Sequence, residues 1–174
     1  MIFIIVGKAG SGKDTAARLM KEIIHDETAI VHYADYVKWL YTHYFGWDGV
    51  KNEKFRTDIQ TIGTDIVRNT YDKDFWVKRL IEQIQIFHGL FEHFIVADAR
   101  FPNEITAMEE TFGCDQVITI RISRPDYETN LTPEQMEHES ETSLDNYLTD
   151  FTIVNDSIDN LKEQLTWLLE GLNA

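Results

Sequence analysis

Short apolar runs and longer stretches of helical periodicity alternate along this chain of 174 residues. The apolar runs are bounded by turn residues or acids and predict five buried strands, at about residues 2–6, 29–33, 94–98, 117–122 and 151–154. Apolar residues three or four positions apart predict helices at about residues 13–25, 36–44, 52–69, 74–87, 102–112 and 158–169. Strands that alternate with helices are typical of an α/β fold with a parallel sheet, which binds ligands at the carboxyl ends of its strands.

A glycine-rich turn joins the first predicted strand to the first predicted helix. Its residues are Gly7, Lys8, Ala9, Gly10, Ser11, Gly12, Lys13, Asp14 and Thr15. A buried strand, a glycine-rich turn with a lysine, and a helix make up the P-loop arrangement. The glycines let backbone N–H groups converge on one point, and the helix directs the positive end of its dipole at the same point. We therefore predict that these nine residues bind the phosphates of a nucleoside triphosphate, with Lys13 reaching the terminal ones.

One position departs from the P-loop pattern. Asp14 stands where a serine or threonine normally holds Mg²⁺, and Thr15 follows it. A carboxylate oxygen is itself a good ligand for Mg²⁺, so Asp14 is a candidate metal ligand. If Asp14 does not place the metal, that role falls to Thr15 and Asp98.

A second acid ends the predicted strand at 94–98, and an arginine follows it. Asp98 ends that strand, where P-loop nucleotidases commonly place a carboxylate for Mg²⁺. The guanidinium of Arg100, two residues later, suits a phosphoryl group. The alternatives are a helix cap or turn acid for Asp98 and a surface salt bridge for Arg100.

The predicted helix at 52–69 carries a polar stripe. Its members repeat every four residues and are Arg56, Gln60, Thr64 and Arg68. At about 100° per residue each step advances only about 40°, so the side chains form one row that could hold a phosphate and read a base edge. Four apolar residues fall on the far side of the helix: Phe55, Ile59, Ile62 and Ile66. A solvated face is the alternative, but Gly63 in mid-helix costs about 1 kcal/mol relative to alanine, which indicates close approach of a ligand or backbone.

Two further features lie between the second strand and this helix. Asp35 ends the second predicted strand and so points toward the ligand edge, where it could contact a sugar hydroxyl or the metal shell; capping the next helix is the alternative. An aromatic cluster follows, made of Trp39, Tyr41, Tyr44, Phe45 and Trp47. Such a cluster is more typical of a core, although one ring, for which Trp39 is our candidate, could stack on a nucleobase.

The stretch from 123 to 147 is polar, acidic and weakly periodic, which predicts an excursion or lid. It contains the run His138, Glu139, Ser140 and Glu141. No Cys/His spacing supports a zinc site, and Ser140 lacks the context of a nucleophile elbow. On pattern alone, His138 is therefore a packing or surface residue.

Charge narrows the class of substrate. The formal net charge is −14, and an acidic chain repels nucleic acid unless its few bases share one cleft. We therefore expect a small phosphorylated substrate and no stable nucleic-acid binding. After Arg124 the only Lys or Arg is Lys162, so phosphate-binding arginines are expected between Lys8 and Arg124.

The length and the cysteine content of the chain indicate its number of domains and its cellular compartment. A chain of 174 residues predicts one domain, and its first apolar strand follows Met1 directly, so we expect no signal or transit peptide. No apolar stretch is long enough to span a membrane. The single cysteine, Cys114, excludes an internal disulfide, and we expect it to be a partly buried thiol after a helix. These features together predict a cytoplasmic protein.

Several motifs, in order along most of the chain, together resemble the deoxynucleoside monophosphate kinases of bacteriophages. They are the P-loop with its Asp14, Trp47-Asp48-Gly49, Arg56…Gln60…Gly63-Thr64-Asp65…Arg68, Asp74-Phe75-Trp76, Asp98-Ala99-Arg100-Phe101-Pro102-Asn103-Glu104 and His138-Glu139-Ser140-Glu141. The resemblance implies a P-loop NTPase-type three-layer fold, with a parallel sheet flanked by helices. It implies transfer of the γ-phosphoryl group of ATP, with Mg²⁺, to a deoxynucleoside monophosphate.

The same resemblance implies a division of the chain and of its site. The core would comprise 1–35, 92–124 and 150–174, with a helical monophosphate-binding insertion at 36–91 and a lid-like excursion at 125–149. Lys13 would hold the ATP phosphates, Asp98 and Arg100 would serve the metal and the transferring group, and four residues would face the monophosphate: Asp35, Arg56, Gln60 and Arg68.

Other implications are less specific. Since residues 125–161 contain no Lys or Arg, Arg121 and Arg124 are the nearest candidates to cover the transferring phosphate. A homodimer is an open alternative, and a phage-encoded protein would act in the host cytoplasm. Two other functions stay open: a P-loop kinase acting on a hydroxymethylated pyrimidine base in DNA, and a nucleotide-binding module without transfer activity.

Overall fold

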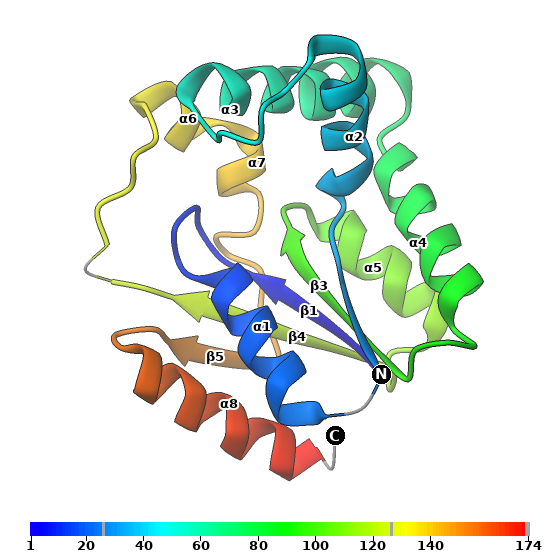
Figure 1. Ribbon diagram of the computed structural model, residues 1–174, viewed down its shortest axis with the longest axis vertical. Coiled ribbons are helices and arrows are strands. Elements are labelled where there is room, and N and C mark those ends of the chain that lie inside the picture. The colour runs from blue at the N-terminus through cyan, green and yellow to red at the C-terminus, as the bar shows by residue number, and fades with distance from the viewer. Residues whose placement is uncertain (26, 126, 173–174) are drawn as a thin grey trace.

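The protein is built on a five-stranded parallel sheet, seen in a computed structural model that describes residues 1–25, 27–125 and 127–172 (Figure 1). The strands are β1 (Ile2–Val6), β2 (Thr28–Val31), β3 (His93–Ala99), β4 (Val117–Ser123) and β5 (Phe151–Val154). Their order is β2-β3-β1-β4-β5, and each neighbouring pair is parallel. β1 lies at the centre and is buried throughout, as a strand covered on both faces should be.

Helices cover both faces of the sheet, which gives three layers (Figure 1). One face packs against α1 (Lys13–Ile24) and α8 (Ile158–Leu172), and the other against α4 (Phe75–Phe87) and α5 (Pro102–Phe112). Successive residues of β1 point to opposite faces, so Ile4 packs in the α4–α5 layer and Phe3 in the α1–α8 layer. This architecture confirms the predicted P-loop NTPase-type α/β class.

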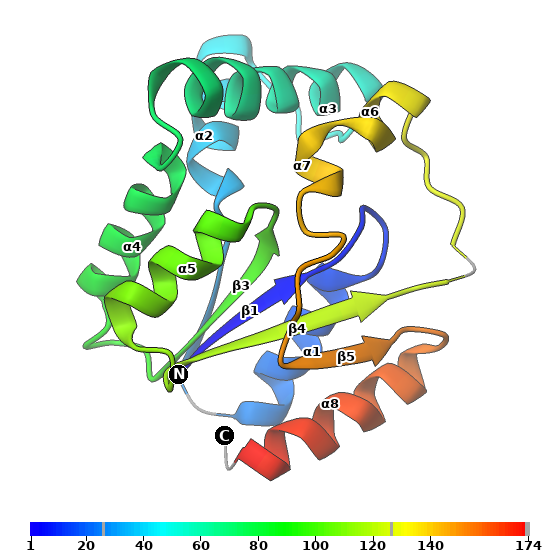
Figure 2. The ribbon, with the colours of Figure 1, turned by 180° about the vertical axis from the view of Figure 1, so that it is seen from behind.

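The remaining helices gather above the carboxyl ends of the strands (Figures 1 and 2). They are α2 (Ala34–Phe45), α3 (Glu53–Gln60), the π-helix η1 (Thr61–Tyr71), α6 (Pro133–Glu137) and α7 (Glu139–Thr142). Figure 2 shows α6 and α7, from late in the chain, lying close to α3 and above the P-loop. This end of the sheet is where α/β proteins bind ligands.

Two element predictions are wrong in ways that matter for the site. The second strand ends at Val31, and α2 begins at Ala34, so Asp35 lies in the first turn of a helix rather than at a strand end. The helix predicted at 52–69 is α-helical only to Gln60 and continues as the π-helix η1. A π-helix bonds residue i to i+5, so the spacing of 100° per residue assumed in the prediction does not apply after that point.

The aromatic cluster and the cysteine also differ from expectation. Only Tyr41 of the cluster is buried, whereas Trp39, Tyr44 and Phe45 are 55%, 70% and 67% exposed. Trp39 stacks on Tyr36 and not in the core. Cys114 follows α5 as predicted but is exposed. Among the described residues, no helix is long and apolar enough to cross a membrane.

Candidate functional site

A cleft of about 890 Å³ lies at the carboxyl ends of the strands, between the P-loop (residues 7–15) and the overlying helices. One wall comprises the P-loop and the turn after β3, and the other comprises α3 and η1. A second groove, of about 790 Å³, lies between β5 and α8 and is lined by no P-loop residue. The first cleft therefore contains the predicted chemistry.

The P-loop adopts a backbone conformation that requires glycine. Gly10 and Gly12 have φ values of +79° and +98°, in the left-handed region. A Cβ on Gly12 would lie 2.3 Å from Nδ2 of Asn155, and one on Gly10 would lie 2.0 Å from Tyr127. The buried Asn155 side chain also donates to the Ser11 carbonyl at 2.8 Å, which fixes the loop from β5. The sequence analysis did not identify Asn155.

Lys13 is buried at the base of the cleft. Its ammonium donates to the carbonyl oxygens of Gly7, at 2.7 Å, and Lys8, at 2.8 Å. Burial, followed by the nearby Arg100 charge, lowers the pKa of Lys13 to about 7. An anion placed beside it would favour the charged form, because opposite charge raises the pKa of an ammonium.

Asp14 faces the cleft between two cationic side chains. Its carboxylate lies 3.8 Å from Nε2 of His32 and 3.9 Å from Nζ of Lys51. The interaction with His32 is the main reason that the pKa of Asp14 falls to about 2. Burial works to lower the pKa of His32, but its contacts with Asp14 and Asp35 raise it to about 9. Asp14 is therefore ionised and faces the cleft, as a metal ligand must.

Asp35 contacts two residues that line the cleft, His32 and Lys38, and its Oδ1 lies 3.6 Å from the Lys38 ammonium. Its Oδ2 accepts a hydrogen bond from the backbone N–H of His32 and lies 3.2 Å from the His32 Nδ1. Asp35 itself does not line the cleft, whereas His32 and Lys51 do. The sequence analysis named neither of these two cations; the place of His32 directly after a strand that ends at the ligand edge is the signal that could have found it.

Asp98 lines the cleft and caps a helix at the same time. Its two oxygens accept the N–H groups of Tyr33, at 2.8 Å, and Ala34, at 3.0 Å, at the start of α2. The described residues contain no group of three or more His, Cys, Asp or Glu that could hold a metal by themselves. Mg²⁺ is normally held by one or two carboxylates together with substrate phosphates and water, so Asp14 and Asp98 fit that pattern.

Arg100 enters the cleft from the turn after β3. Its Nη1 pairs with Glu141 Oε2 at 2.8 Å, and its backbone N–H donates to Glu104 at 2.6 Å. Glu104 also accepts the N–H of Phe101 at 3.0 Å, so this buried carboxyl fixes the turn that carries the guanidinium. Burial raises the pKa of Glu104 to about 7.

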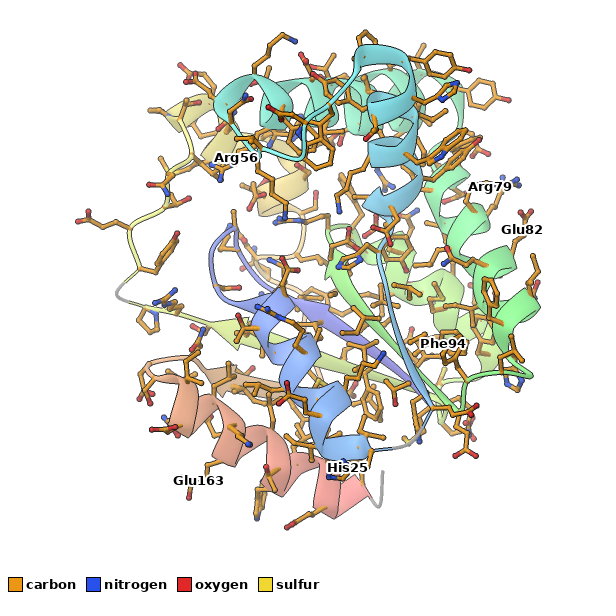
Figure 3. All side chains as sticks on the ribbon, viewed as in Figure 1. His25, Arg56, Arg79, Glu82, Phe94 and Glu163 are labelled. Carbon is orange, nitrogen blue, oxygen red and sulfur yellow. The ribbon has the colours of Figure 1, made fainter. Side chains whose placement is uncertain are left out.

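Three of the four residues of the predicted polar stripe lie on the opposite wall of the cleft. Arg56, Gln60 and Thr64 line the cleft. Figure 3 shows Arg56 projecting from α3 toward the P-loop side of the cleft. Phe55 and Ile59, predicted for the far side of the helix, line the same cleft, which corrects the predicted separation of faces.

Arg68 is the one stripe residue that does not line the cleft. Its guanidinium lies 3.6 Å from the ring centroid of Phe101 and donates to the Lys73 carbonyl at 2.9 Å and to Asn103. These contacts hold the guanidinium against Phe101 and the segment after η1, which is why Arg68 does not line the cleft.

Gly63 lies within the π-helix and also lines the cleft. A Cβ at this position would meet nothing within 4 Å, so no neighbouring backbone explains the glycine. Its carbonyl accepts the indole N–H of Trp76 at 2.7 Å, and the buried Trp76 lines the cleft as well. The sequence analysis quoted Trp76 only within the resemblance.

Three other positions complete the comparison with the predicted site. Trp39 is not among the residues that line the cleft. Arg124 lines it, with its guanidinium 4.6 Å from the ring centroid of Tyr127 and 3.5 Å from the Gly10 carbonyl. Arg121 instead donates to two carbonyls of the 125–149 segment, at 2.8 Å each, and does not line the cleft.

The predicted lid supplies three residues that sequence reasoning did not place in the site. Leu131, Ser140 and Glu141 line the cleft. The lid is held over α3 and η1 by Gln135, which donates to Thr57 at 3.1 Å, and by Glu139, which accepts from Asn69 at 2.6 Å. These contacts join residues 70 or more positions apart, so no local pattern reveals them.

Comparison with known proteins agrees with this geometry. A protein of Ictalurid herpesvirus 1 (strain Auburn), named uncharacterized protein ORF77, is 34% identical over 152 residues, which are 87% of this chain and 62% of that protein. A deoxynucleotide monophosphate kinase of Enterobacteria phage T4 is 28% identical over 75 residues, which are 42% of this chain and 31% of that protein. The match thus spans about three fifths of the herpesvirus protein and about one third of the phage kinase.

Solved structures share the fold. A shikimate kinase from Bacteroides thetaiotaomicron superposes with a TM-score of 0.54 and 11% identity, covering 100% of this chain and 99% of that one. The family model described as deoxynucleotide monophosphate kinase matches residues 50–165, which include α3, η1, the Asp98–Arg100 turn and the lid. This chain therefore belongs to the deoxynucleotide monophosphate kinase family.

Proposed function

We propose that the protein transfers the γ-phosphoryl group of ATP to a deoxynucleoside 5′-monophosphate, giving ADP and a deoxynucleoside diphosphate. One observation carries this proposal: a single cleft joins the P-loop to a wall that presents Arg56, Gln60 and Thr64. The P-loop suits a triphosphate, and the opposite wall offers a cation and an amide to a second, base-bearing phosphate. The membership in a kinase family supports the same reaction.

The cleft residues divide the reaction between them. An oxygen of the acceptor phosphate attacks the γ-phosphorus of ATP, and the bond to the β-γ bridging oxygen breaks as ADP leaves. Lys13 and Arg100 neutralise charge on the transferring group, and Arg124, which lines the cleft beside the Gly10 carbonyl, is the arginine that would cover it. Asp14 and Asp98 would hold Mg²⁺, which supplies further charge neutralisation when bound. Such transfer depends on positioning and electrostatics more than on covalent chemistry.

The acceptor wall favours a nucleotide over a small phosphorylated metabolite. Gln60 offers both donor and acceptor groups to a base edge. Trp76 and Phe101 supply apolar ring surface beside it, since both line the cleft. Asp35 and Arg68 do not line it, so in this proposal they support the acceptor site through His32 and through Phe101.

A substrate panel tests the proposal. The protein is mixed with MgATP and, separately, with each deoxynucleoside monophosphate, each ribonucleoside monophosphate and a duplex that carries hydroxymethyluracil. Formation of a deoxynucleoside diphosphate is the expected result. Phosphorylation of the duplex alone would favour a kinase of modified DNA. ATP binding that Lys13→Ala abolishes, with no acceptor phosphorylated, would favour a binding module without transfer activity.

A further inference from the structure

A lid carboxylate touches both the P-loop and its arginine. Glu141 Oε2 accepts the backbone N–H of Ala9 at 3.1 Å and pairs with Arg100 Nη1 at 2.8 Å. The Glu141 side chain is only 8% exposed. One negatively charged oxygen is thus held by a P-loop amide and a guanidinium, as a phosphate oxygen would be.

The groups that hold Glu141 cannot serve it and a phosphate equally well. The Ala9 amide has a single hydrogen, and a phosphate oxygen bound there would lie beside a partly desolvated carboxylate. Two like charges a few ångströms apart in a protein cleft repel each other more strongly than in water, because the effective dielectric constant is lower. The two anions therefore exclude each other unless the carboxylate moves.

The segment that carries Glu141 is fastened to the P-loop at other points too. Lys8 donates to the Glu141 carbonyl at 2.7 Å and pairs with Asp145. Residues 125–161 contain no Lys or Arg, so this lid brings an acid to the P-loop where arginine would be the phosphate-binding choice.

The other end of α7 is fixed to the acceptor wall. His138 Nε2 lies 3.5 Å from Asp65, and Glu139 accepts from Asn69, both residues of η1. The His138 Nδ1 also accepts the Ser140 N–H at 3.2 Å, which sets the start of α7. Movement of Glu141 away from the P-loop would therefore move a segment that also touches η1.

We propose that the Glu141 carboxylate is an internal competitor for the donor phosphate site, and that a polyphosphate must displace it from Ala9 and Arg100 to bind. The inference rests on the P-loop part of the proposed function and is independent of the acceptor. Its consequence is that part of the binding energy of ATP is used to release α7.

Binding measured without any acceptor tests this proposal. Glu141→Gln keeps the size of the side chain and removes its charge, and Glu137→Gln makes the same change at an exposed residue of α6 that does not line the cleft. We expect Glu141→Gln to bind MgATP and inorganic tripolyphosphate at least ten times more tightly than the wild type in calorimetry. Glu137→Gln should stay within twofold. Unchanged or weaker binding by Glu141→Gln would overturn the proposal, and a weakening confined to MgATP would assign Glu141 to the metal instead.

The wild-type protein offers a second test that needs no variant. The amides of Glu141 and Ser143 donate within the α7 turn, to the carbonyls of His138 and Glu139. If tripolyphosphate displaces Glu141, hydrogen exchange at residues 139–145 should become faster on its addition; slower or unchanged exchange would contradict displacement. Because both tests omit the acceptor, failure of every monophosphate as a substrate would overturn the proposed function and leave this inference standing.

Discussion

The two walls of the cleft are built on different principles. The P-loop wall is a backbone structure, in which positive φ at Gly10 and Gly12 aims N–H groups and neighbours such as Asn155 leave no room for a side chain. The acceptor wall is a side-chain structure, presented by a helix that changes from α to π at Thr61. Backbone geometry is determined by a short sequence motif, whereas side-chain presentation depends on contacts from distant parts of the chain.

The difference shows in how each wall is held. Lys13 bonds to carbonyls five and six residues away. Gly63, in contrast, is tied to Trp76, Arg68 to Phe101 and Asn69 to Glu139, so α4, the turn before α5, and α7 all contribute to the acceptor wall. We expect the donor wall to tolerate few substitutions and the acceptor wall to be adjustable.

Substitution of the P-loop lysine should have the largest effect. Lys13→Met should lower kcat for phosphoryl transfer by about 10²–10³-fold, the range for loss of one charge-stabilising donor. It should leave the free energy of unfolding unchanged or higher, because it removes a buried charge. Steady-state kinetics and urea unfolding measure the two effects. A variant that loses activity only in proportion to its loss of folded protein would contradict a role in the reaction.

The buried carboxyl beside Arg100 should make stability depend on pH. The pKa of Glu104 is raised to about 7, so the folded protein binds more protons than the unfolded chain between about pH 4.5 and 7. Stability from this group is therefore lost as pH rises through that window, by about 3 kcal/mol. Urea unfolding at pH 5 and pH 8 measures how much the free energy of unfolding decreases between the two. Glu104→Gln should make this decrease smaller by about that amount, whereas Glu110→Gln, at an exposed position of α5, should not change it. Identical pH dependence in all three proteins would refute this environment for Glu104.

Substitutions of the two stripe arginines should affect different quantities, acceptor binding for Arg56 and protein stability for Arg68. Arg56→Gln should raise KM for the acceptor about tenfold with little change in stability, since its bond to the Asn130 carbonyl is long, at 3.3 Å, and exposed. Arg68→Gln should lower the free energy of unfolding by about 1–2 kcal/mol through loss of its contacts with Phe101 and the Lys73 carbonyl. If instead Arg68→Gln raised KM and Arg56→Gln lowered the stability, Arg68 would have to be placed in the acceptor site.

Two glycine substitutions should change the free energy of unfolding in opposite directions, with the smaller effect at Gly63. Gly63→Ala should raise the free energy of unfolding by about 0.5–1 kcal/mol, because alanine favours a helix and the position is open. Gly12→Ala should lower it by about 1 kcal/mol or more, because its φ and Asn155 both oppose a Cβ. Thermal unfolding of the pair compares the walls directly. Equal effects would show that the P-loop backbone is not held as we describe.

Much of the fold follows from local pattern. The central strand, the P-loop, α5 with Pro102 in its first turn and the terminal helix lie where apolar spacing and helix-start signals predict them. The division into core, insertion and lid stays a prediction. Local pattern fails at η1, because apolar spacing does not distinguish i+4 from i+5 bonding, and at Asp35, which lies in the first turn of α2.

Site residues that belong to short sequence motifs could be predicted, whereas those that reach the cleft through contacts between distant parts of the chain could not. Lys13, Asp14, Asp98 and Arg100 all line the cleft, and each lies at the end of a strand or directly after a strand or glycine-rich turn. Glu141 contacts Ala9 across 132 residues of sequence, so periodicity could not assign it. Trp39 shows the reverse error: an aromatic side chain near the ligand edge suggested a base platform, but Trp39 stacks on Tyr36 and does not line the cleft.

The central claim is that one cleft brings a donor and an acceptor phosphate together. A single-turnover reaction tests it most directly: excess protein is mixed with γ-³²P-labelled MgATP and a deoxynucleoside monophosphate, and the label is followed by chromatography. We predict that the label moves to the deoxynucleoside diphosphate at a rate that depends on acceptor concentration and that falls in Arg56→Gln. Label found only in inorganic phosphate, or remaining on ATP with every deoxynucleoside monophosphate, would contradict the account.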